Sequence, residues 1–335
     1  MKLCIQIAVI FTAFFVANTA IAQSTVTRLS DIEFAGISSV AHIDADQFLI
    51  TLKSDSSLAF IYDAASDSVT KHLPAELPDR HMNTGIDFGL HDQQRSEFIL
   101  FSDSGWLIRI NREGEIIGEN RIQTGTVNFG VIHGNQLWLS ISGRIPAREL
   151  KAGNPVEVAR VFSMDDFRMI NRIQLSAYQL GIEIDPEISS NSRISLYPFI
   201  IPLGNRRILS TVTGSASINL LDDSGNVISS FSESDIFFEA AEHRSHGSGI
   251  RIPAVQTGAE IKNGGVMFTN GNRYQNRPFN VSLLTIEDDR LISKTSEVEF
   301  EHVFSSIKVS TGVQYRLFYD SFPTQANYLI LERLP

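Results

Sequence analysis

Short apolar runs, each of about 4 to 8 residues, recur along this chain and are separated by polar turns. The runs are rich in Val, Ile, Leu, Phe and Thr, and the turns are rich in Gly, Asp, Asn and Ser. Branched and aromatic side chains fit a pleated surface, so such runs are typical of β-strands. No long stretch has the spacing of an amphipathic helix. The pattern predicts an all-β protein made of many short strands.

The runs group into similar units of about four strands. Two successive units open with near copies of one motif, Asp87-Phe88-Gly89-Leu90 and Asn128-Phe129-Gly130-Val131, and they begin about 40 residues apart, which is the spacing of propeller blades. Other units begin near residues 36, 197, 250 and 307. We therefore expect a β-propeller of six blades, or of seven if residues 165–195 contain a further weak unit.

The two ends of the chain predict how the ring closes. The last unit contains only three strand-like runs, near residues 307–311, 314–319 and 328–331, while an unassigned run, Thr25–Leu29, precedes the first unit. That N-terminal run can supply the missing outer strand of the last blade. Closure of this kind protects sheet edges that would otherwise pair with other molecules.

A short turn containing glycine precedes the fourth strand of several units, as in Glu113-Gly114 and Ser224-Gly225. In this turn and in its spacing the chain resembles the secreted six-bladed propellers of the NHL-repeat and gluconolactonase-like superfamily. The resemblance covers most of the chain and implies a propeller fold. In the enzymes of that superfamily, acidic and amide side chains at inner-strand ends hold a central cation, and Asn83 and Asp87 have that chemistry.

The N-terminus has the pattern of an export signal. Lys2 is followed by an apolar stretch over residues 5–16 and by the small-x-small sequence Ala20-Ile21-Ala22. We expect residues 1–22 to be a signal peptide and residues 23–335 to form one propeller domain in the periplasm or outside the cell. Cys4, the one cysteine, lies inside the signal. The apolar stretch is shorter than the roughly 20 residues that span a bilayer, so we expect no membrane insertion after its removal.

Charge narrows the classes of partner. The chain has 28 Lys and Arg against 38 Asp and Glu, a formal net charge of −10 at pH 7. A general nucleic-acid binder needs a basic surface that displaces counterions from phosphates. We therefore expect no nucleic-acid partner.

The longer connections between strands predict which face of the ring binds ligands. In a four-stranded antiparallel blade, the connections between strands two and three and between consecutive blades emerge at the same end. The expanded connections, at residues 74–84, 142–156, 176–195, 232–249 and 270–278, all belong to these two kinds. Loops carried on a rigid scaffold commonly hold binding residues. This end is the predicted functional face. The alternative is that these loops became longer without gaining a function, because insertions at a surface cost little free energy.

Two sets of side chains on this face are candidates for a site. The first could support catalysis by a cation-dependent hydrolase, lactonase or lyase, with calcium or zinc as the cofactor, since His243 and His246 have a spacing that suits one metal ion. Its proposed catalytic residues are His81, Asp87, His243 and His246. The second set suits a carboxylated glycan or an acidic protein surface, because guanidinium groups beside an aromatic ring bind carboxylates and stack. Its proposed ligand-binding residues are Asn83, Arg144, Arg148, Arg244, Arg273, Tyr274 and Arg277.

No nucleophile elbow, zinc-protease motif, phosphate-binding loop or dinucleotide fingerprint occurs in the sequence. The leading hypothesis is therefore an exported binding or scaffold protein for a glycan or another exported protein. The enzyme hypothesis is the alternative, and the two differ in whether the protein holds a metal ion.

Overall fold

The structure is a computed structural model. It describes residues 24–28, 37–44, 46–53, 58–76, 78–81, 85–122, 126–182, 184, 186–212 and 217–232, together with the strands between residues 255 and 333 named below. For β1 and for the strands after residue 254, the description covers the backbone only.

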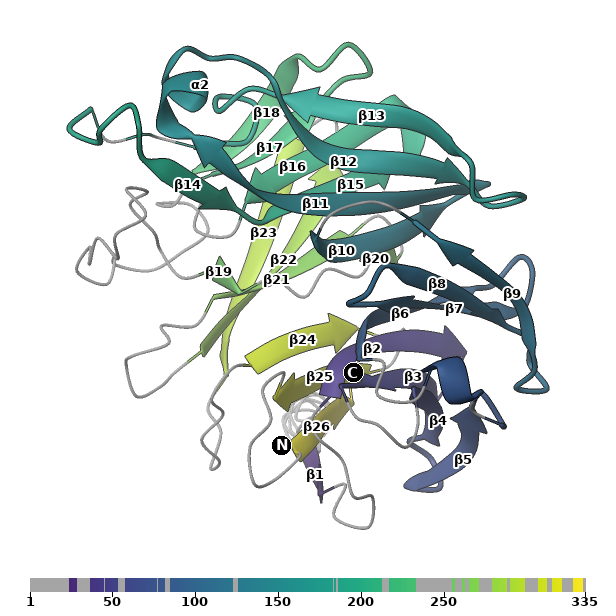
Figure 1. Cartoon of the computed structure of the whole chain (residues 1–335). Coiled ribbons are helices and arrows are strands. Elements are labelled where there is room, and N and C mark those ends of the chain that lie inside the picture. Colours follow the sequence, from purple (N-terminus) through teal and green to yellow (C-terminus); the bar gives the residue numbers. More distant parts are fainter. Residues whose placement is uncertain are drawn as a thin grey trace, which may run out of the picture.

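The chain folds as an all-β propeller, in which the strands pair into six sheets (Figure 1). The first three sheets use strands that follow one another along the chain. Sheet 1 consists of β2 (Ile37–Asp44), β3 (Gln47–Leu52), β4 (Ala59–Asp63) and β5 (Ser68–Leu73). Sheet 2 consists of β6 (Ile86–Asp92), β7 (Glu97–Ser102), β8 (Trp106–Ile110) and β9 (Ile116–Arg121). Sheet 3 consists of β10 (Thr126–His133), β11 (Gln136–Pro146), β12 (Val156–Ser163) and β13 (Met169–Leu175), with β14 (Arg193–Leu196) paired to β11.

The other three sheets complete the propeller. Sheet 4 consists of β15 (Pro198–Leu203), β16 (Arg207–Val212), β17 (Ser217–Leu221) and β18 (Val227–Ser232). Sheet 5 consists of β19 (Val255–Gln256), β21 (Gly265–Asn270), β22 (Phe279–Glu287) and β23 (Arg290–Val298), with β20 (Ile261–Lys262) paired to β21. Sheet 6 consists of β24 (Ile307–Thr311), β25 (Tyr315–Asp320), β26 (Tyr328–Arg333) and β1 (Ser24–Arg28).

The sheets differ in their number of strands. Four of them have the plain four-stranded form, and two carry a fifth strand, β14 or β20. The predicted count of six or seven blades is not confirmed, because only four of the six sheets have the plain four-stranded form of a blade. The alternative of seven is wrong, because the described part of residues 165–195 forms no separate sheet: β13 completes sheet 3 and β14 adds to β11.

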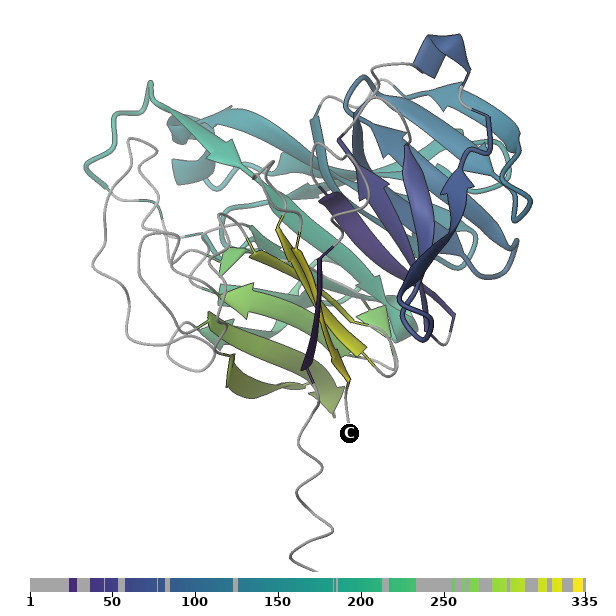
Figure 2. The ribbon, with the colours of Figure 1, turned by 90° about the horizontal axis from the view of Figure 1, so that it is seen from below.

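Closure by the N-terminal strand is confirmed. β1 pairs with β26 in antiparallel register from Ser24 opposite Glu332 to Arg28 opposite Tyr328. Figure 2 shows the dark purple β1 beside the yellow strands of sheet 6. The first strand of the chain therefore joins its last sheet, and β24 of that sheet contacts β2 of sheet 1.

Helices are few among the described residues. They are α2 (Ala147–Lys151) and the short 3-10 helices η1 (Asp79–His81) and η2 (Gly204–Arg206). None of the described helices has the length and apolar character needed to cross a bilayer.

The core lies between neighbouring sheets. Along β7, Phe98 and Leu100 pack in the cluster shared with sheet 1, whereas Ile99 and Phe101 pack in the cluster shared with sheet 3. All four side chains are buried. Successive residues of a strand point to opposite faces of its sheet, so one continuous apolar run fills two cores. This explains why β7 lacks the polar face of a half-exposed sheet.

The inner strands β2, β6 and β10 each carry a β-bulge at the same place. The extra residue is Ser38 in β2, Asp87 in β6 and Asn128 in β10. A bulge inserts one unpaired residue and bends the strand. The repeated motif seen in the sequence therefore marks an equivalent bend in three successive sheets.

Two glycines beyond the bulges let the inner strands approach the preceding sheets. A Cβ atom at Gly89 would lie 2.5 Å from Cγ2 of Thr51, and one at Gly130 would lie 2.5 Å from Cε2 of Phe88. Carbon atoms pack at about 3.5 to 4.0 Å, so neither position has room for a larger residue. The amide N–H of Gly89 also donates to Oγ of Ser39 in sheet 1, at 2.9 Å.

The close approach predicts that Gly130→Ala lowers the free energy of unfolding by about 1 to 3 kcal/mol, the usual cost of overpacking. Gly118→Ala is the matched control, because its Cβ would lie 3.5 Å from Arg109 Cδ, an ordinary contact. Urea unfolding of both variants measures the difference. Adding Phe88→Leu to Gly130→Ala shortens the obstructing side chain and should recover part of the loss. Equal stability of the two alanine variants would contradict the explanation.

Candidate functional site

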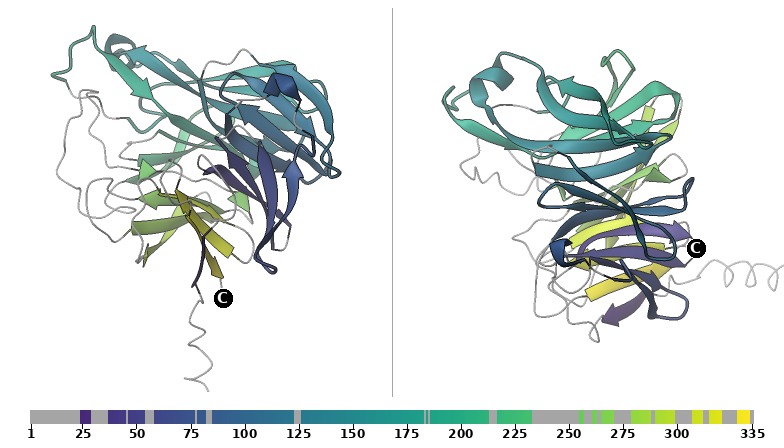
Figure 3. Two further views of the ribbon diagram at one scale, coloured as in Figure 1. Left: turned by 60° about the horizontal axis from the view of Figure 1, so that its bottom comes forward. Right: turned by 45° about the vertical axis from the view of Figure 1, so that its right-hand side comes forward.

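Two long connections of sheets 3 and 4 fold together into one structure. β11 continues past the end of sheet 3, where its last four residues pair with β14 from Gly143 opposite Leu196 to Pro146 opposite Arg193. We call these eight paired residues the β11–β14 ribbon. We call the described residues of 142–156 and 176–196, which include α2, the extension. Figures 1 and 3 show α2 and β14 on the same side of the molecule.

Hydrogen bonds hold the two parts of the extension together. The Ala147 amide donates to the Ser192 carbonyl at 2.8 Å, and the Arg148 amide donates to the Ser190 carbonyl at 3.2 Å. The Lys151 ammonium donates to the carbonyl oxygens of Pro186 and Ile188, at 2.8 and 2.7 Å. The expectation that residues 142–156 and 176–195 emerge at one end of the ring is thus confirmed.

The extension also has an apolar core. Ala147, Leu150, Ile194 and Leu196 are all buried and belong to one cluster. The same cluster includes Ile200 of β15 and other side chains of sheets 3 and 4. The extension is therefore anchored to the propeller by buried side chains, and a folded element of this kind gives its surface residues fixed positions.

The opposite face of the ribbon is polar and basic. Arg144 and Arg193 are exposed, Ser195 is half-exposed, and Tyr197, just after β14, has 48% of its surface exposed. Side chains of directly paired residues, and of residues two apart, lie on the same face of a ribbon. Arg144 pairs with Ser195 and Arg193 pairs with Pro146, so both guanidinium groups belong to the face opposite Ile194 and Leu196. No ion pair joins either arginine to another described residue.

Sequence reasoning nominated Arg144 but missed Arg193 and Tyr197. The signal was present, because Arg193-Ile194-Ser195-Leu196-Tyr197 alternates polar and apolar positions as a strand does. From the sequence, the residues up to 195 instead belong to a long connection, and the next unit begins near Tyr197. Its pairing partner, β11, lies about 50 residues away in the chain, and a strand this short gives no indication of its partner.

Arg148 lies in α2 and is exposed, as expected. Its Nε atom contacts Oε1 of Glu149 at 3.3 Å. A hydrogen bond from Asn154, followed by the interaction with Arg148, lowers the pKa of Glu149 below its ordinary value. The negative charge nearest Arg148 is therefore already engaged within the extension.

His81, a predicted catalytic residue, is fully buried in the structure. Its Nε2 atom lies 2.7 Å from Oε1 of Glu119 on β9, and its ring meets Trp106 edge-on with 5.8 Å between the centroids. The contacts fix the η1 segment against the outer part of sheet 2. Solvent does not reach the ring in this arrangement.

Asp87 lies at the bulge of the inner strand β6 and is half-buried. The equivalent residue Asn128 has a clear structural role: its amide donates to the Pro198 carbonyl at 2.6 Å and its carbonyl accepts from Ser142 at 3.0 Å. Ser38, the third bulge residue, bonds to Thr51 at 2.8 Å. The structure does not bring Asp87 and His81 into one described cluster.

The remaining predicted site residues lie outside the described part of the chain. They are Asn83, His243, Arg244, His246, Arg273, Tyr274 and Arg277. Their roles stay predictions. Among the residues that the structure describes, no three His, Cys, Asp or Glu side chains group in a way that could hold a metal ion.

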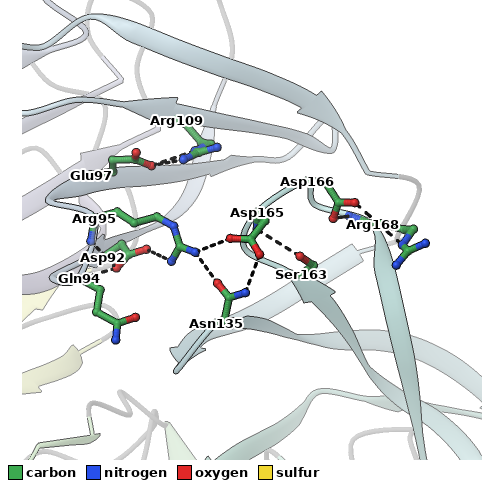
Figure 4. Close-up of polar contacts among 10 residues, drawn as sticks. All are labelled: Asp92, Gln94, Arg95, Glu97, Arg109, Asn135, Ser163, Asp165, Asp166 and Arg168. Carbon is green, nitrogen blue, oxygen red and sulfur yellow. Dashed lines mark hydrogen bonds and ion pairs between the residues drawn. The ribbon is translucent and has the colours of Figure 1, made fainter.

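A second polar cluster joins sheets 2 and 3 at their tight turns, and Figure 4 shows its members. Arg95 binds Asp92 in its own turn through Nη1 at 3.0 Å and Asp165 in sheet 3 through Nη2 at 2.7 Å, and it also donates to Asn135. Asn135 in turn donates to Asp165 at 2.8 Å. We call Asp92, Arg95, Asn135 and Asp165 the turn clamp.

The charges of the turn clamp satisfy one another. Hydrogen bonding from Asn135, and then from Arg95, lowers the pKa of Asp165. Desolvation alone would lower the pKa of Arg95, but its bonds to Asp92 and Asp165 outweigh that effect and raise it. Nothing in this geometry leaves a charge unpaired for a ligand, so the turn clamp stabilises the propeller and is not the candidate site.

Comparisons with known proteins show the fold alone. No protein-family model matches the chain, and no curated protein matches it. Among solved structures, a member of the DUF4221 family from Bacteroides vulgatus is similar with a TM-score of 0.60 and 12% identity, over 93% of this chain and 96% of that one. A putative exported protein from Bacteroides fragilis has a TM-score of 0.53 and 10% identity, over 95% and 96%.

The WD40 repeats of RRP9 are similar with a TM-score of 0.56 and 10% identity, over 93% of this chain and 97% of that one. At such identities a shared fold carries no shared activity. The matches support the propeller fold, and the expected membership in the gluconolactonase-like superfamily stays a prediction.

Removing the Arg95 side chain should weaken the contact between sheets 2 and 3. Arg95→Ala leaves the Asp92 carboxylate, whose side chain is 2% exposed, without its charged partner. We expect a loss of about 2 kcal/mol in the free energy of unfolding, typical of a hydrogen bond to a charged group. Arg168→Ala is the control, since Arg168 and Asp166 are exposed and 4.0 Å apart, and it should have almost no effect. Urea titration of both variants tests this, and equal losses would refute the role of the turn clamp.

Acid should remove the contribution of Asp165. Because its folded-state pKa is lowered, the stabilisation is present above the ordinary aspartate pKa of about 3.9 and disappears as the pH falls through the lowered value. At pH 7, Asp165→Asn should melt at a lower temperature than the wild type, and the gap should narrow as the pH falls below the ordinary aspartate pKa. A gap that stays constant from pH 7 to pH 3 would show that this carboxylate is not the origin of the effect.

Proposed function

We propose that this protein is an exported β-propeller that binds a macromolecular partner, a glycan or another exported protein, through the face that carries the extension. In this proposal residues 1–22 are a signal peptide, residues 23–335 form one domain, and the six sheets are the six blades of one ring. The sequence pattern of the first 22 residues supports export, and structural similarity to a putative exported protein agrees with it.

The observation that carries the proposal is that two separate connections form one folded extension. Loops that grow without a function need no core, because insertions at a surface cost little free energy. Here residues from both connections share backbone hydrogen bonds and a buried cluster. A surface built on such a support is held in place before a partner arrives, which lowers the entropic cost of binding.

The alternative, a cation-dependent hydrolase, lactonase or lyase, has less support. His81 is enclosed by Glu119 and Trp106. Among the described residues, no three His, Cys, Asp or Glu side chains lie close enough together to hold a metal ion. His243 and His246 lie outside the described part, so this function stays a prediction.

Site-specific photo-crosslinking in the native host tests the binding function. A photoreactive amino acid at Arg148, on the extension, should give a discrete adduct with a macromolecule. The same amino acid at Arg168, an exposed residue beside the turn clamp, is the matched control and should give none. Protease or glycosidase digestion of the adduct then identifies the class of partner. Adducts of equal yield from both positions, or none from Arg148, would contradict the proposal.

A further inference from the structure

The outer edge of β14 is open among the described residues. β14 pairs with β11 along one side, and no described strand pairs with its other side. An open strand edge presents unpaired backbone donors and acceptors, and it is a template for another extended chain. Proteins usually cover or shorten such edges, so an open one on the candidate binding face is a possible docking site.

The hydrogen-bond pattern of the ribbon shows which backbone groups face outward. One step beyond the last ladder pair, the Ala147 amide donates to the Ser192 carbonyl. In an antiparallel ladder, hydrogen-bonded and non-hydrogen-bonded pairs alternate. The pair of Ile145 and Ile194 is therefore hydrogen-bonded, and the pair of Arg144 and Ser195 is not.

The pair of Pro146 and Arg193 is also non-hydrogen-bonded, which suits Pro146 because proline has no N–H to donate. The N–H and C=O groups of Arg193 and Ser195 therefore point away from β11.

Side chains around this edge favour a negatively charged partner. Arg193 lies on the edge strand itself, Arg144 lies diagonally across the ribbon, and Tyr197 follows at the end of β14. Because Arg144 pairs with Ser195, it is offset from Arg193 by two residues along the ribbon, or about 6.8 Å, the separation of alternate residues of an added strand. Two guanidinium groups at this spacing match two carboxylates on alternate residues of an extended peptide.

The overall charge makes this basic group distinctive. The chain has a net charge of −10, and the nearby Glu149 is bound to Arg148 and Asn154. A peptide is favoured over an acidic glycan because only a peptide can use the outward backbone donors and acceptors of Arg193 and Ser195 as a complete ladder.

We propose that the free edge of β14 binds an extended acidic segment of an exported partner protein, which adds as a strand to the β11–β14 ribbon. Backbone bonds to Arg193 and Ser195 supply the register, and Arg144 and Arg193 select carboxylates at alternate positions. The proposal rests on the binding function proposed above and specifies its partner.

Fluorescence anisotropy with the purified full chain tests the proposal through four probes. They are a labelled octapeptide of alternating Thr and Glu, the same peptide with Lys in place of Glu, the Glu peptide N-methylated at alternate residues, and labelled polygalacturonate. We expect the Glu peptide to bind, and the Lys and N-methylated peptides to bind at least about 10-fold more weakly, the effect of losing one charged or ladder contact. Polygalacturonate should also bind at least about 10-fold more weakly.

Protein variants test the same contacts from the other side. Arg144→Glu and Arg193→Glu should each weaken binding of the Glu peptide by about 10-fold or more. Arg168→Glu, a matched charge reversal beside the turn clamp, should leave the affinity unchanged. The N-methylated peptide keeps the test decisive if an arginine variant fails to fold, because it leaves the protein untouched.

Each contrary outcome has a distinct meaning. Equal binding of the N-methylated peptide, or of polygalacturonate, would overturn strand addition and leave a purely electrostatic surface. No binding of the Glu peptide while the Arg148 adduct persists would overturn the β14 site but keep the proposed function. Loss of both signals would overturn both.

Discussion

The structure depends on how closely the inner strands of sheets 2 and 3 approach the sheets before them. At Gly89 and Gly130 the distance leaves no room for a Cβ atom, and the strands are bent by bulges just before these glycines. Because the apolar core lies between sheets and not at one centre, a sheet that stood further out would open two interfaces at once. The glycines therefore set the spacing on which burial of the neighbouring strands depends.

Further contacts between sheets follow a common design. The Ala75 amide, just after β5, donates to the Gly114 carbonyl in the last turn of sheet 2 at 2.9 Å. In the same way the Gln179 side chain, after β13, donates to the Gly225 carbonyl in the last turn of sheet 4 at 2.6 Å. Both glycines have positive φ angles, which other residues adopt only with strain. Each connection is thus hydrogen-bonded to a turn of a neighbouring sheet close to the point where the connection begins.

The same contacts hold the candidate binding face. β15 is fixed to sheet 3 by a hydrogen bond from the Ile200 amide to Oγ of Ser140, at 3.1 Å, and by the bond from Asn128 to Pro198. β14 ends two residues before Pro198, so the ribbon adjoins the part of the inner strand that these two bonds hold. Its position is a consequence of the packing between sheets, which is why a short four-residue strand can present side chains in fixed places.

The sequence was sufficient for features that follow from the repeat and insufficient for contacts that lie outside it. The motifs at Asp87 and Asn128 indicated equivalent inner strands because they repeat at the spacing of one blade. The spare run near Thr25 indicated closure because the last unit lacked one strand of the repeat. The pairing of β11 with β14 and the bond from Arg95 to Asp165 join segments about 50 and 70 residues apart. No local pattern encodes such contacts, so Arg193, Tyr197 and the turn clamp became visible only in the fold.

The account rests on a ribbon that is folded in the free protein and open along one edge. Residue-resolved amide hydrogen exchange of the isolated protein tests this most directly. The amides of Ile194 and Leu196, which face β11, should exchange slowly, while those of Arg193 and Ser195 exchange quickly. Rapid exchange at all four positions would show that the extension is not folded without a partner, and slow exchange at all four would show that the edge is already covered.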